Sequence, residues 1–293
     1  MPKKRSLNLL LFALFLVAAT NCSKQTTLPV STTLPAYDIS LLAVTANSFN
    51  TSEQTTNARA IQMVGDSLLF VHSRGNNMVF SYLLERKGDI RSATYYQSFS
   101  AENYIGSTAQ DKNGHGLFVR QDDLKKMWLF NRTEIWEFEL LEAGNISTAV
   151  YSDYLDLAEY VERGHGIFFH PDGTNLYVDD RNKELVHQFT LMTPWSIDGF
   201  NTHVSLDVAA YQEAIRAVTF HPDGQDMYLL DTELQLVQHF RLQHAWQIET
   251  AVFHQQKSIS LSNPRSFTWN STGTAAYIMN TDDGVIYEFV ISE

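Results

Sequence analysis

The chain has 293 residues, of which 44% are hydrophobic and 12% aromatic, so it is long enough to bury a large core without covalent staples. Its formal net charge of −12 disfavours nucleic acid and anionic membrane surfaces as partners, because like charges repel. The sequence contains one cysteine, so the folded region has no pair from which to build a disulfide.

The first 21 residues have the features of a secretory signal peptide, with basic residues at 3–5 before an apolar run at 9–19. That run is too short to span a bilayer, which needs about 20 residues. The motif at 19–22, Ala-Thr-Asn-Cys, resembles a bacterial lipobox, which implies that Cys22 is lipidated and becomes the mature N-terminus. The alternative is ordinary cleavage after Ala19, which leaves a soluble secreted or periplasmic protein.

Residues 22–36 are rich in Ser, Thr and Pro, which predicts a flexible tether between the lipidated N-terminus and a folded domain at 37–293. Ser23 stands directly after Cys22, where an aspartate would favour the inner membrane. We therefore expect a lipid-anchored protein of the cell envelope, at the outer membrane of a Gram-negative bacterium, with the lipid as its sole membrane attachment.

The folded region repeats itself five times, with a period of about 50 residues. When the repeats are aligned, three columns of equivalent residues define the register. The residues of the third column below are 51, 56, 51 and 51 positions apart. An aromatic of the second strand recurs at Phe70, Trp128, Tyr177, Tyr228 and Tyr277; an aromatic of the third strand at Tyr82, Phe138, Phe189, Phe240 and Phe289; and a branched residue opening the fourth strand at Ile39, Ile90, Ile146, Ile197 and Ile248. The long interval indicates an insertion around 104–113. A period of this length with frequent turn signals is typical of a β-propeller.

Each repeat divides into four strands. The first is short and apolar, as at 166–169, 217–220 and 266–269, and a His-Pro-Asp-Gly turn follows at 170–173 and 221–224. The second strand ends in a small polar residue: Asp180, Asp231, Asn280, Asn131 or Ser73. We interpret these side chains as acceptors for the backbone of the next turn rather than as metal ligands.

The ends of the chain predict how the ring closes. The last repeat finishes at 286–291 without a fourth strand, and the missing strand, with its Tyr-Asp-Ile-Ser start, lies at 37–50. A shared blade removes the unpaired edges that a ring would otherwise leave open. The sequence therefore predicts an all-β, five-bladed β-propeller in which residues 37–50 form the outermost strand of the C-terminal blade.

The repeats at 166–197 and 217–248 resemble a family of bacterial and phage-associated propeller repeats. That family carries a Ser-Pro-Asp-Gly turn and a Thr-Leu-Ser-Thr-Pro-Trp-Asp-Ile segment, which 189–197 matches closely, and 146–149 keeps its Ile-Ser-Thr-Ala. The chain also resembles YVTN-type and NHL-type propellers, but more loosely. The resemblance spans 37–293 and implies the propeller fold, but it implies no common activity, so function has to be argued from the site.

The predicted channel-side strands at 61–63, 117–119, 167–169, 218–220 and 267–269 contain no Asp, Glu or His. A propeller glycosidase would place carboxylates there, and a lactonase would need oxygen ligands for a hard cation. The sequence also has no Gly-x-Ser-x-Gly nucleophile elbow. A binding or scaffolding protein without metal or cofactor is therefore favoured, and a lactonase-type or glycosidase-type hydrolase is the alternative. The histidines of the His-Pro-Asp-Gly turns, His170 and His221, are interpreted as turn residues rather than metal ligands.

One column has an unusual charge. The residue just before each innermost strand is basic in all five repeats: Arg59, His115, His165, Arg216 and Arg265. These residues are expected to encircle the channel mouth and bind an anionic group, with the two histidines strengthening binding as the pH falls through about 6.5. The alternative is that they pair with nearby acids, such as Glu162 and Glu213.

The expected partner is a protein, a glycan or a small anionic ligand outside the cytoplasm, and the protein is expected to be a monomer. A purely structural component of the envelope is a third possibility, for which the sequence offers no test.

Overall fold

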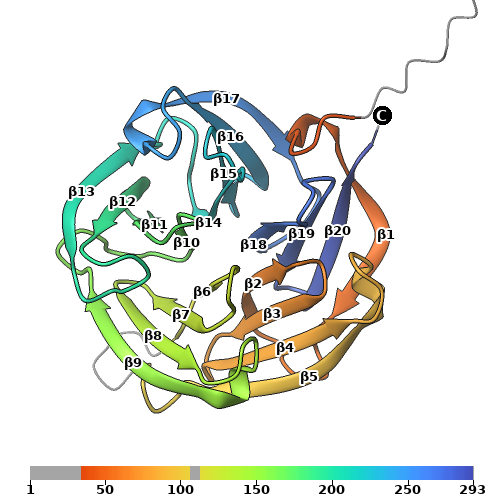
Figure 1. The fold of residues 1–293 in the computed structure, drawn as a ribbon. Coiled ribbons are helices and arrows are strands. Elements are labelled where there is room, and N and C mark those ends of the chain that lie inside the picture. Colours follow the sequence, from red (N-terminus) through yellow and green to blue (C-terminus); the bar gives the residue numbers. More distant parts are fainter. Residues whose placement is uncertain (1–33, 106–112, 293) are drawn as a thin grey trace, which may run out of the picture. The chain divides into compact units, whose positions relative to one another are not determined.

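The computed structural model describes residues 34–105 and 113–292, and they form five antiparallel sheets of four strands each. The sheets are arranged as blades around a central axis (Figure 1), which confirms the predicted five-bladed β-propeller. The residues of the predicted signal peptide, Cys22 and most of the predicted tether lie outside the described residues, as does most of the predicted insertion. None of the helices within the described ranges has the length and apolar character needed to cross a membrane.

The blades follow chain order, each from its innermost to its outermost strand. The first contains β2 (Ala58–Val64), β3 (Leu68–Ser73), β4 (Met78–Leu84) and β5 (Ala93–Ser100), and the second contains β6 (Gly116–Val119), β7 (Lys126–Asn131), β8 (Glu134–Leu140) and β9 (Ala149–Asp156). The third contains β10 (Ile167–Phe169), β11 (Asn175–Asp180), β12 (Leu185–Leu191) and β13 (Phe200–Asp207). The fourth contains β14 (Ile215–Phe220), β15 (Asp226–Asp231), β16 (Leu236–Leu242) and β17 (Ala251–Ser258).

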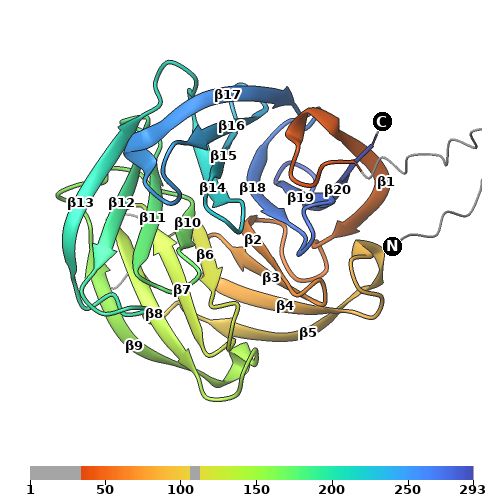
Figure 2. The ribbon, with the colours of Figure 1, turned by 45° about the horizontal axis from the view of Figure 1, so that its top comes forward.

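The fifth blade is shared between the two ends of the described chain. It contains β18 (Pro264–Trp269), β19 (Ala275–Asn280), β20 (Val285–Ile291) and, outermost, β1 (Leu42–Asn50). β1 pairs antiparallel with β20, from Leu42 opposite Ile291 to Asn50 opposite Val285. Figures 1 and 2 both show the orange β1 beside the blue β20. The predicted closure of the ring is thus confirmed.

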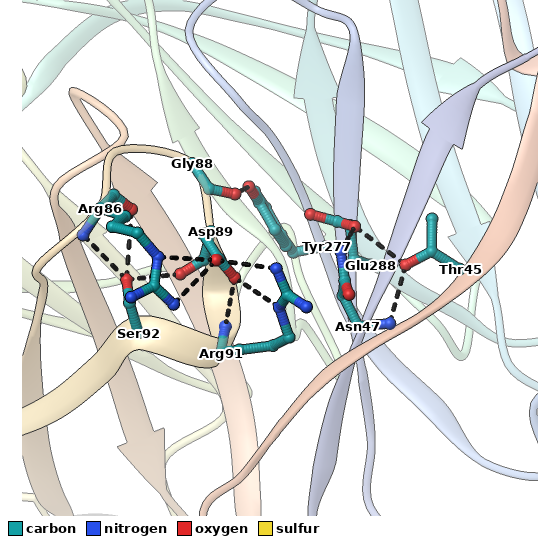
Figure 3. A network of polar contacts seen from close by, with 9 residues as sticks. All are labelled: Thr45, Asn47, Arg86, Gly88, Asp89, Arg91, Ser92, Tyr277 and Glu288. Carbon is teal, nitrogen blue, oxygen red and sulfur yellow. Dashed lines mark hydrogen bonds and ion pairs between the residues drawn. The ribbon is translucent and has the colours of Figure 1, made fainter.

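Polar contacts hold the closing blade to itself and to the first blade (Figure 3). The Glu288 carboxylate on β20 accepts hydrogen bonds from Thr45 Oγ1 at 2.9 Å and Asn47 Nδ2 at 2.7 Å, both on β1. Across the blade boundary, the Tyr277 hydroxyl donates to the Gly88 carbonyl oxygen at 2.8 Å. The seam is therefore joined by side chains as well as by strand pairing.

The two aromatic columns form the core between blades. All five second-strand aromatics are at most 1% exposed, and all five third-strand aromatics are at most 4% exposed. The second-strand tyrosines also join neighbouring blades through their hydroxyls: Tyr177 donates to the Trp246 carbonyl oxygen, and Tyr228 donates to that of Tyr37. The repeated aromatic residues are thus primarily core, as expected from their period.

The isoleucine column differs in detail from the prediction. The five isoleucines are fully buried, but four of them lie in short 3-10 helices that precede the outer strand: η1 (Ile39–Leu41), η2 (Ile90–Ser92), η3 (Ile146–Thr148) and η4 (Ile248–Thr250). The outer strands begin at the third residue after each isoleucine, as β1 does at Leu42. The Asp38, Asp89 and Asn145 side chains accept the backbone N–H two residues on and so cap three of these helices.

Two of the polar residues that end the second strands, Asp180 and Asp231, have the predicted structural role, because each accepts a backbone N–H of the turn that follows it. The Asp180 carboxylate accepts hydrogen bonds from the backbone N–H groups of Glu162 and Arg163, at 2.7 and 3.1 Å. Asp231 does the same for Glu213 and Ala214 in the next blade. These carboxylates hold the loops that enter the innermost strands of the third and fourth blades, and thereby position the residues of those blades at the channel mouth.

Candidate functional site at the channel mouth

The innermost strands β2, β6, β10, β14 and β18 surround the axis of the ring (Figure 1). A cavity of about 210 Å³ lies at their N-terminal ends and one of about 360 Å³ at their C-terminal ends. A narrow space of about 40 Å³ lies between the ends. The lining of the two larger cavities differs completely, so the channel has two chemically distinct mouths.

The cavity at the N-terminal ends is lined almost entirely by cationic and imidazole side chains, and we name it the basic mouth. All five predicted residues line it: Arg59, His115, His165, Arg216 and Arg265. The other lining residues are Arg74, Arg163, Arg181 and Glu233. The structure therefore brings the predicted ring together, while the binding of an anion stays a prediction.

β-Bulges place three of the arginines. The pairing of β14 with β15 skips Arg216, that of β18 with β19 skips Arg265, and that of β2 with β3 skips Arg59. A bulged residue has no partner opposite it and its side chain is re-aimed relative to the regular alternation. The repeated bulge explains why one sequence column reaches the same mouth in three blades.

The two histidines form the deepest part of the basic mouth. Their rings meet edge to face with centroids 4.5 Å apart, and they are 6% and 5% exposed. A guanidinium nitrogen of Arg216 donates to His165 Nε2. His165 Nε2 must then be the unprotonated nitrogen, so the neutral tautomer carries its proton on Nδ1, 4.0 Å from the Asp179 carboxylate.

Burial and neighbouring positive charge hold both histidines neutral. The pKa of His115 lies well below its usual value because the ring is desolvated and faces Arg74, Arg216 and Arg59. The pKa of His165 is likewise lowered by burial, by His115 and by Arg216. The expected strengthening of anion binding at about pH 6.5 is therefore wrong, because neither imidazole gains a proton in that range.

The arginines carry the charge instead, and they are incompletely paired. Burial and the adjacent guanidiniums lower the pKa of Arg216 to about 8, and burial with Arg74 lowers that of Arg59 to about 10. Among the described residues, the Nε atoms of Arg59, Arg74, Arg216 and Arg265 are buried without an acceptor. These cations lie in a site that favours a negative ligand.

The acids proposed as alternative partners lie elsewhere. The Glu162 carboxylate is 3.8 Å from Lys183 and half exposed, and Glu213 is exposed. The one carboxylate in the lining of the basic mouth is Glu233, which accepts a hydrogen bond from Arg181 at 3.1 Å. Two carboxylates outside the lining also act on these arginines, Asp179 on Arg216 and Asp282 on Arg59 and Arg265, so the positive charge of the mouth is compensated only in part.

The predicted set of basic residues missed three arginines of the lining: Arg163, and also Arg74 and Arg181. Arg74 and Arg181 directly follow the last residue of a second strand, as Arg132 does in the second blade. A second column was thus readable one residue beyond the capping polar residue. It was overlooked because the fourth and fifth blades have threonine there, at Thr232 and Thr281.

The His-Pro-Asp-Gly turns lie at the opposite end of the innermost strands, and their histidines have the same geometry in both copies. His170 Nδ1 is 2.6 Å from an Asp172 carboxylate oxygen, and His221 Nδ1 is 2.7 Å from one of Asp223. Together with Asp226, the second set could place three ligand atoms within 4.8 Å of one another. The repetition of the contact in the third blade indicates a turn role, as predicted.

No known protein-family profile and no curated protein matches the chain. Similar solved structures include one described as the mitotic checkpoint complex (8% identity, TM-score 0.46, covering 80% of this chain and 63% of that one). They also include a protein of unknown function from Desulfotomaculum acetoxidans (13%, 0.46, 76% and 65%) and a protein from Lactobacillus plantarum (12%, 0.47, 73% and 61%). The chain spans less than two thirds of the length of these proteins.

Proposed function

We propose that this protein is an extracytoplasmic, membrane-tethered binding propeller that captures an anionic group at its basic mouth. One observation carries the proposal: six arginines converge on a single cavity with one carboxylate among its lining residues, in a protein whose net charge is −12. Two like charges about 8 Å apart repel by about 2 kcal/mol at an effective dielectric of 20, and a ring multiplies such pairs. A bound anion would offset this repulsion.

The chemistry of the mouth favours a carboxylate or phosphate. Guanidinium groups present planar pairs of N–H donors that match these anions, and they retain their charge at neutral pH. The buried Nε–H groups of Arg216 and Arg265 lack acceptors among the described residues and would supply such donors. The neutral His115 contributes a polar ring without adding a titrating charge.

The hydrolase alternative receives no support from the basic mouth. A glycosidase needs two carboxyl groups with separate roles, and the lining of this mouth contains Glu233 alone. That carboxylate binds Arg181, on the neighbouring blade.

A melting-temperature series tests the proposal. Phosphate, sulfate, citrate and glucuronate should be added at low ionic strength, where the Debye length is long. An anion at about 100 times its Kd stabilises the fold by about 2.7 kcal/mol, which raises the melting temperature of a domain this size by about 5–10 °C. With sulfate, whose charge does not change between pH 6 and pH 7, we expect similar shifts at both, because the histidines stay neutral and Arg216, with its pKa lowered to about 8, stays mostly charged.

The double variant Arg216→Ala, Arg265→Ala should lose most of this stabilisation. Its matched control is Arg86→Ala, Arg91→Ala, which removes the same charge from exposed side chains around Asp89 (Figure 3). Equal shifts in the two double variants, or no shift with any anion, would contradict an anion site at the basic mouth.

The membrane tether rests on Cys22, which lies outside the described residues. We predict that Cys22→Ala moves the protein from the membrane fraction to the soluble fraction, because the lipid is the proposed attachment. The check is fractionation of intact cells together with mass spectrometry of the N-terminus. Unchanged membrane association of the variant, with an unmodified cysteine in the wild type, would refute lipidation.

A further inference from the structure

The second mouth of the channel, at the C-terminal ends of the innermost strands, has an aromatic lining. Its cavity of about 360 Å³ is within the size range of small-molecule sites, which are mostly apolar with a few polar groups. We name it the aromatic mouth. Phe118, Phe168 and Phe220 come from the innermost strands, and Trp195, Trp246 and Trp269 complete the wall.

Three rings at this mouth are presented by an unusual backbone. Tyr37, Trp195 and Trp246 have φ of 62°, 62° and 67°, a left-handed conformation that costs a bulky residue about 1–2 kcal/mol. The first two blades place glycine at the same point, Gly88 and Gly144. The fold therefore accepts glycine at this position, and an aromatic ring there is an addition rather than a requirement of the turn.

Each of these rings lies flat on the hairpin glycine of its own blade. A Cβ added to Gly173 would be 2.4 Å from the Trp195 ring, and one added to Gly224 would be 2.2 Å from that of Trp246. The glycines thus support one face of each indole. Since Trp195 and Trp246 also line the cavity, a large aromatic surface is presented to it on a fixed backing.

The aromatic mouth also contains an unsatisfied donor. Trp269 is 7% exposed, and its indole Nε1–H has no hydrogen-bond partner among the described residues. Because this nitrogen is fully enclosed, an acceptor oxygen of a ligand reaches it only if the indole turns toward the cavity. A hydrocarbon or a quaternary ammonium group would leave this donor unpaired.

The charges around the cavity are internally compensated. The Asp122 carboxylate accepts two hydrogen bonds from Arg120, at 2.6 and 2.8 Å, and the Arg120 guanidinium lies 4.7 Å from the centre of the Trp195 ring. The remaining polar lining is neutral and comes from side chains such as Thr219, Thr268 and Asn270. The mouth therefore lacks the fixed excess charge that an ionic ligand would need.

From these observations we infer that the aromatic mouth is a second binding site, which takes a neutral saccharide unit. A sugar ring offers apolar C–H faces, which pack on the negative faces of aromatic rings, and hydroxyl groups, which can form hydrogen bonds with the lining residues Thr219 and Asn270. This inference does not depend on the anion site, because the two mouths share no lining residue.

The test is a titration of the purified protein with glucose, galactose, mannose, N-acetylglucosamine and their β-1,4-linked disaccharides, followed by tryptophan fluorescence and saturation-transfer NMR. At least one neutral sugar should give a saturable change. Trp246→Gly should weaken its binding about tenfold, because it removes one of the aromatic rings on which the sugar packs. Glycine suits the backbone there, and the melting temperature verifies that the variant is folded.

Two controls separate this site from the basic mouth and from general surface aromatics. The first control is the double variant Arg216→Ala, Arg265→Ala. The second is Tyr96→Ala, which alters a half-exposed ring on the outer strand β5. Both variants should bind the sugar as the wild type does. Absence of a saturable change with every sugar, binding of choline instead, or equal affinity in a folded Trp246→Gly variant would each overturn the inference.

Discussion

Removing residues 23–50 is expected to abolish the cooperative unfolding transition or to lower the free energy of unfolding by several kcal/mol. The deletion takes away β1, which exposes the edge of β20 and uncovers the core. Ile39 and Leu42 are 0% and 2% exposed, and apolar area exposed to water costs about 25 cal/mol per Å². Circular dichroism with thermal and urea unfolding measures the effect.

Removing residues 23–35 is the control for this truncation. Within the described residues the hydrogen bonds of the ring begin at Tyr37, whose N–H donates to the Gly273 carbonyl oxygen at 2.7 Å. The short truncation should therefore leave stability unchanged. A matched pair of substitutions gives the same contrast: Leu42→Asp should destabilise strongly, and Val44→Asp, at a side chain 54% exposed on the same strand, should do so far less. Equal stability of the two truncations would contradict the shared blade.

The second large effect is loss of stability on acidification. Burial lowers the pKa of His72 and of His187 to about 4, and holds those of His115 and His165 well below their usual value. The unfolded chain binds these protons near pH 6.5 and the folded chain does not, so stability is complete above pH 6.5 and falls as the pH drops. Each histidine contributes about 1.4 kcal/mol per pH unit in this window.

One carboxyl acts in the opposite direction. Burial raises the pKa of Asp179 to about 7, so its folded form takes up a proton first and gains stability as the pH falls from 7. At pH 5 the unfolded chain has taken up protons on the four histidines, whereas the folded chain has taken up one on Asp179. The unfolded chain therefore binds about three more protons, and the free energy of unfolding should fall by several kcal/mol between pH 7 and pH 5.

Urea unfolding at pH 7, 6 and 5 measures this slope. His72→Asn should reduce this slope by about one proton, because it removes a titrating imidazole. The amide can still donate to the Gly116 carbonyl oxygen, which His72 Nδ1 contacts at 3.1 Å, so the variant should fold. The exposed His244 provides the control, and His244→Asn should keep the slope of the wild type. A stability that is constant over this range would show that the buried histidines titrate normally.

The fold could be predicted from the sequence because the determinants of a propeller repeat in it. The aromatic columns recur in every blade at the same distance from the turns, and the strand at 42–50 matches the one missing after Ile291. The 3-10 helices were missed because three residues with a side-chain cap resemble the start of a strand. In three of them the side chain of Asp38, Asp89 or Asn145 accepts a backbone N–H, a contact that periodicity does not reveal, and η4 forms without such a cap.

The site was predictable in composition but less so in its physical chemistry. The basic column identified five of the residues that line the basic mouth, whereas the bulges that re-aim Arg59, Arg216 and Arg265 are a property of strand pairing. The neutral state of His165 depends on burial and on Arg216, which the sequence does not specify. The aromatic mouth was missed because Trp195, Trp246 and Trp269 lie outside the two aromatic columns that define the repeat.

Isothermal titration of the wild-type protein with phosphate, sulfate and citrate, at pH 7 and about 10 mM ionic strength, tests the basic mouth most directly. We expect one saturable site for at least one of these anions. Its affinity should fall as salt is added. The double variant Arg216→Ala, Arg265→Ala should show no binding, and the double variant Arg86→Ala, Arg91→Ala should bind as the wild type does. No measurable binding of any anion, or binding that is unchanged in the Arg216 and Arg265 variant, would contradict the proposal that this cavity binds anions.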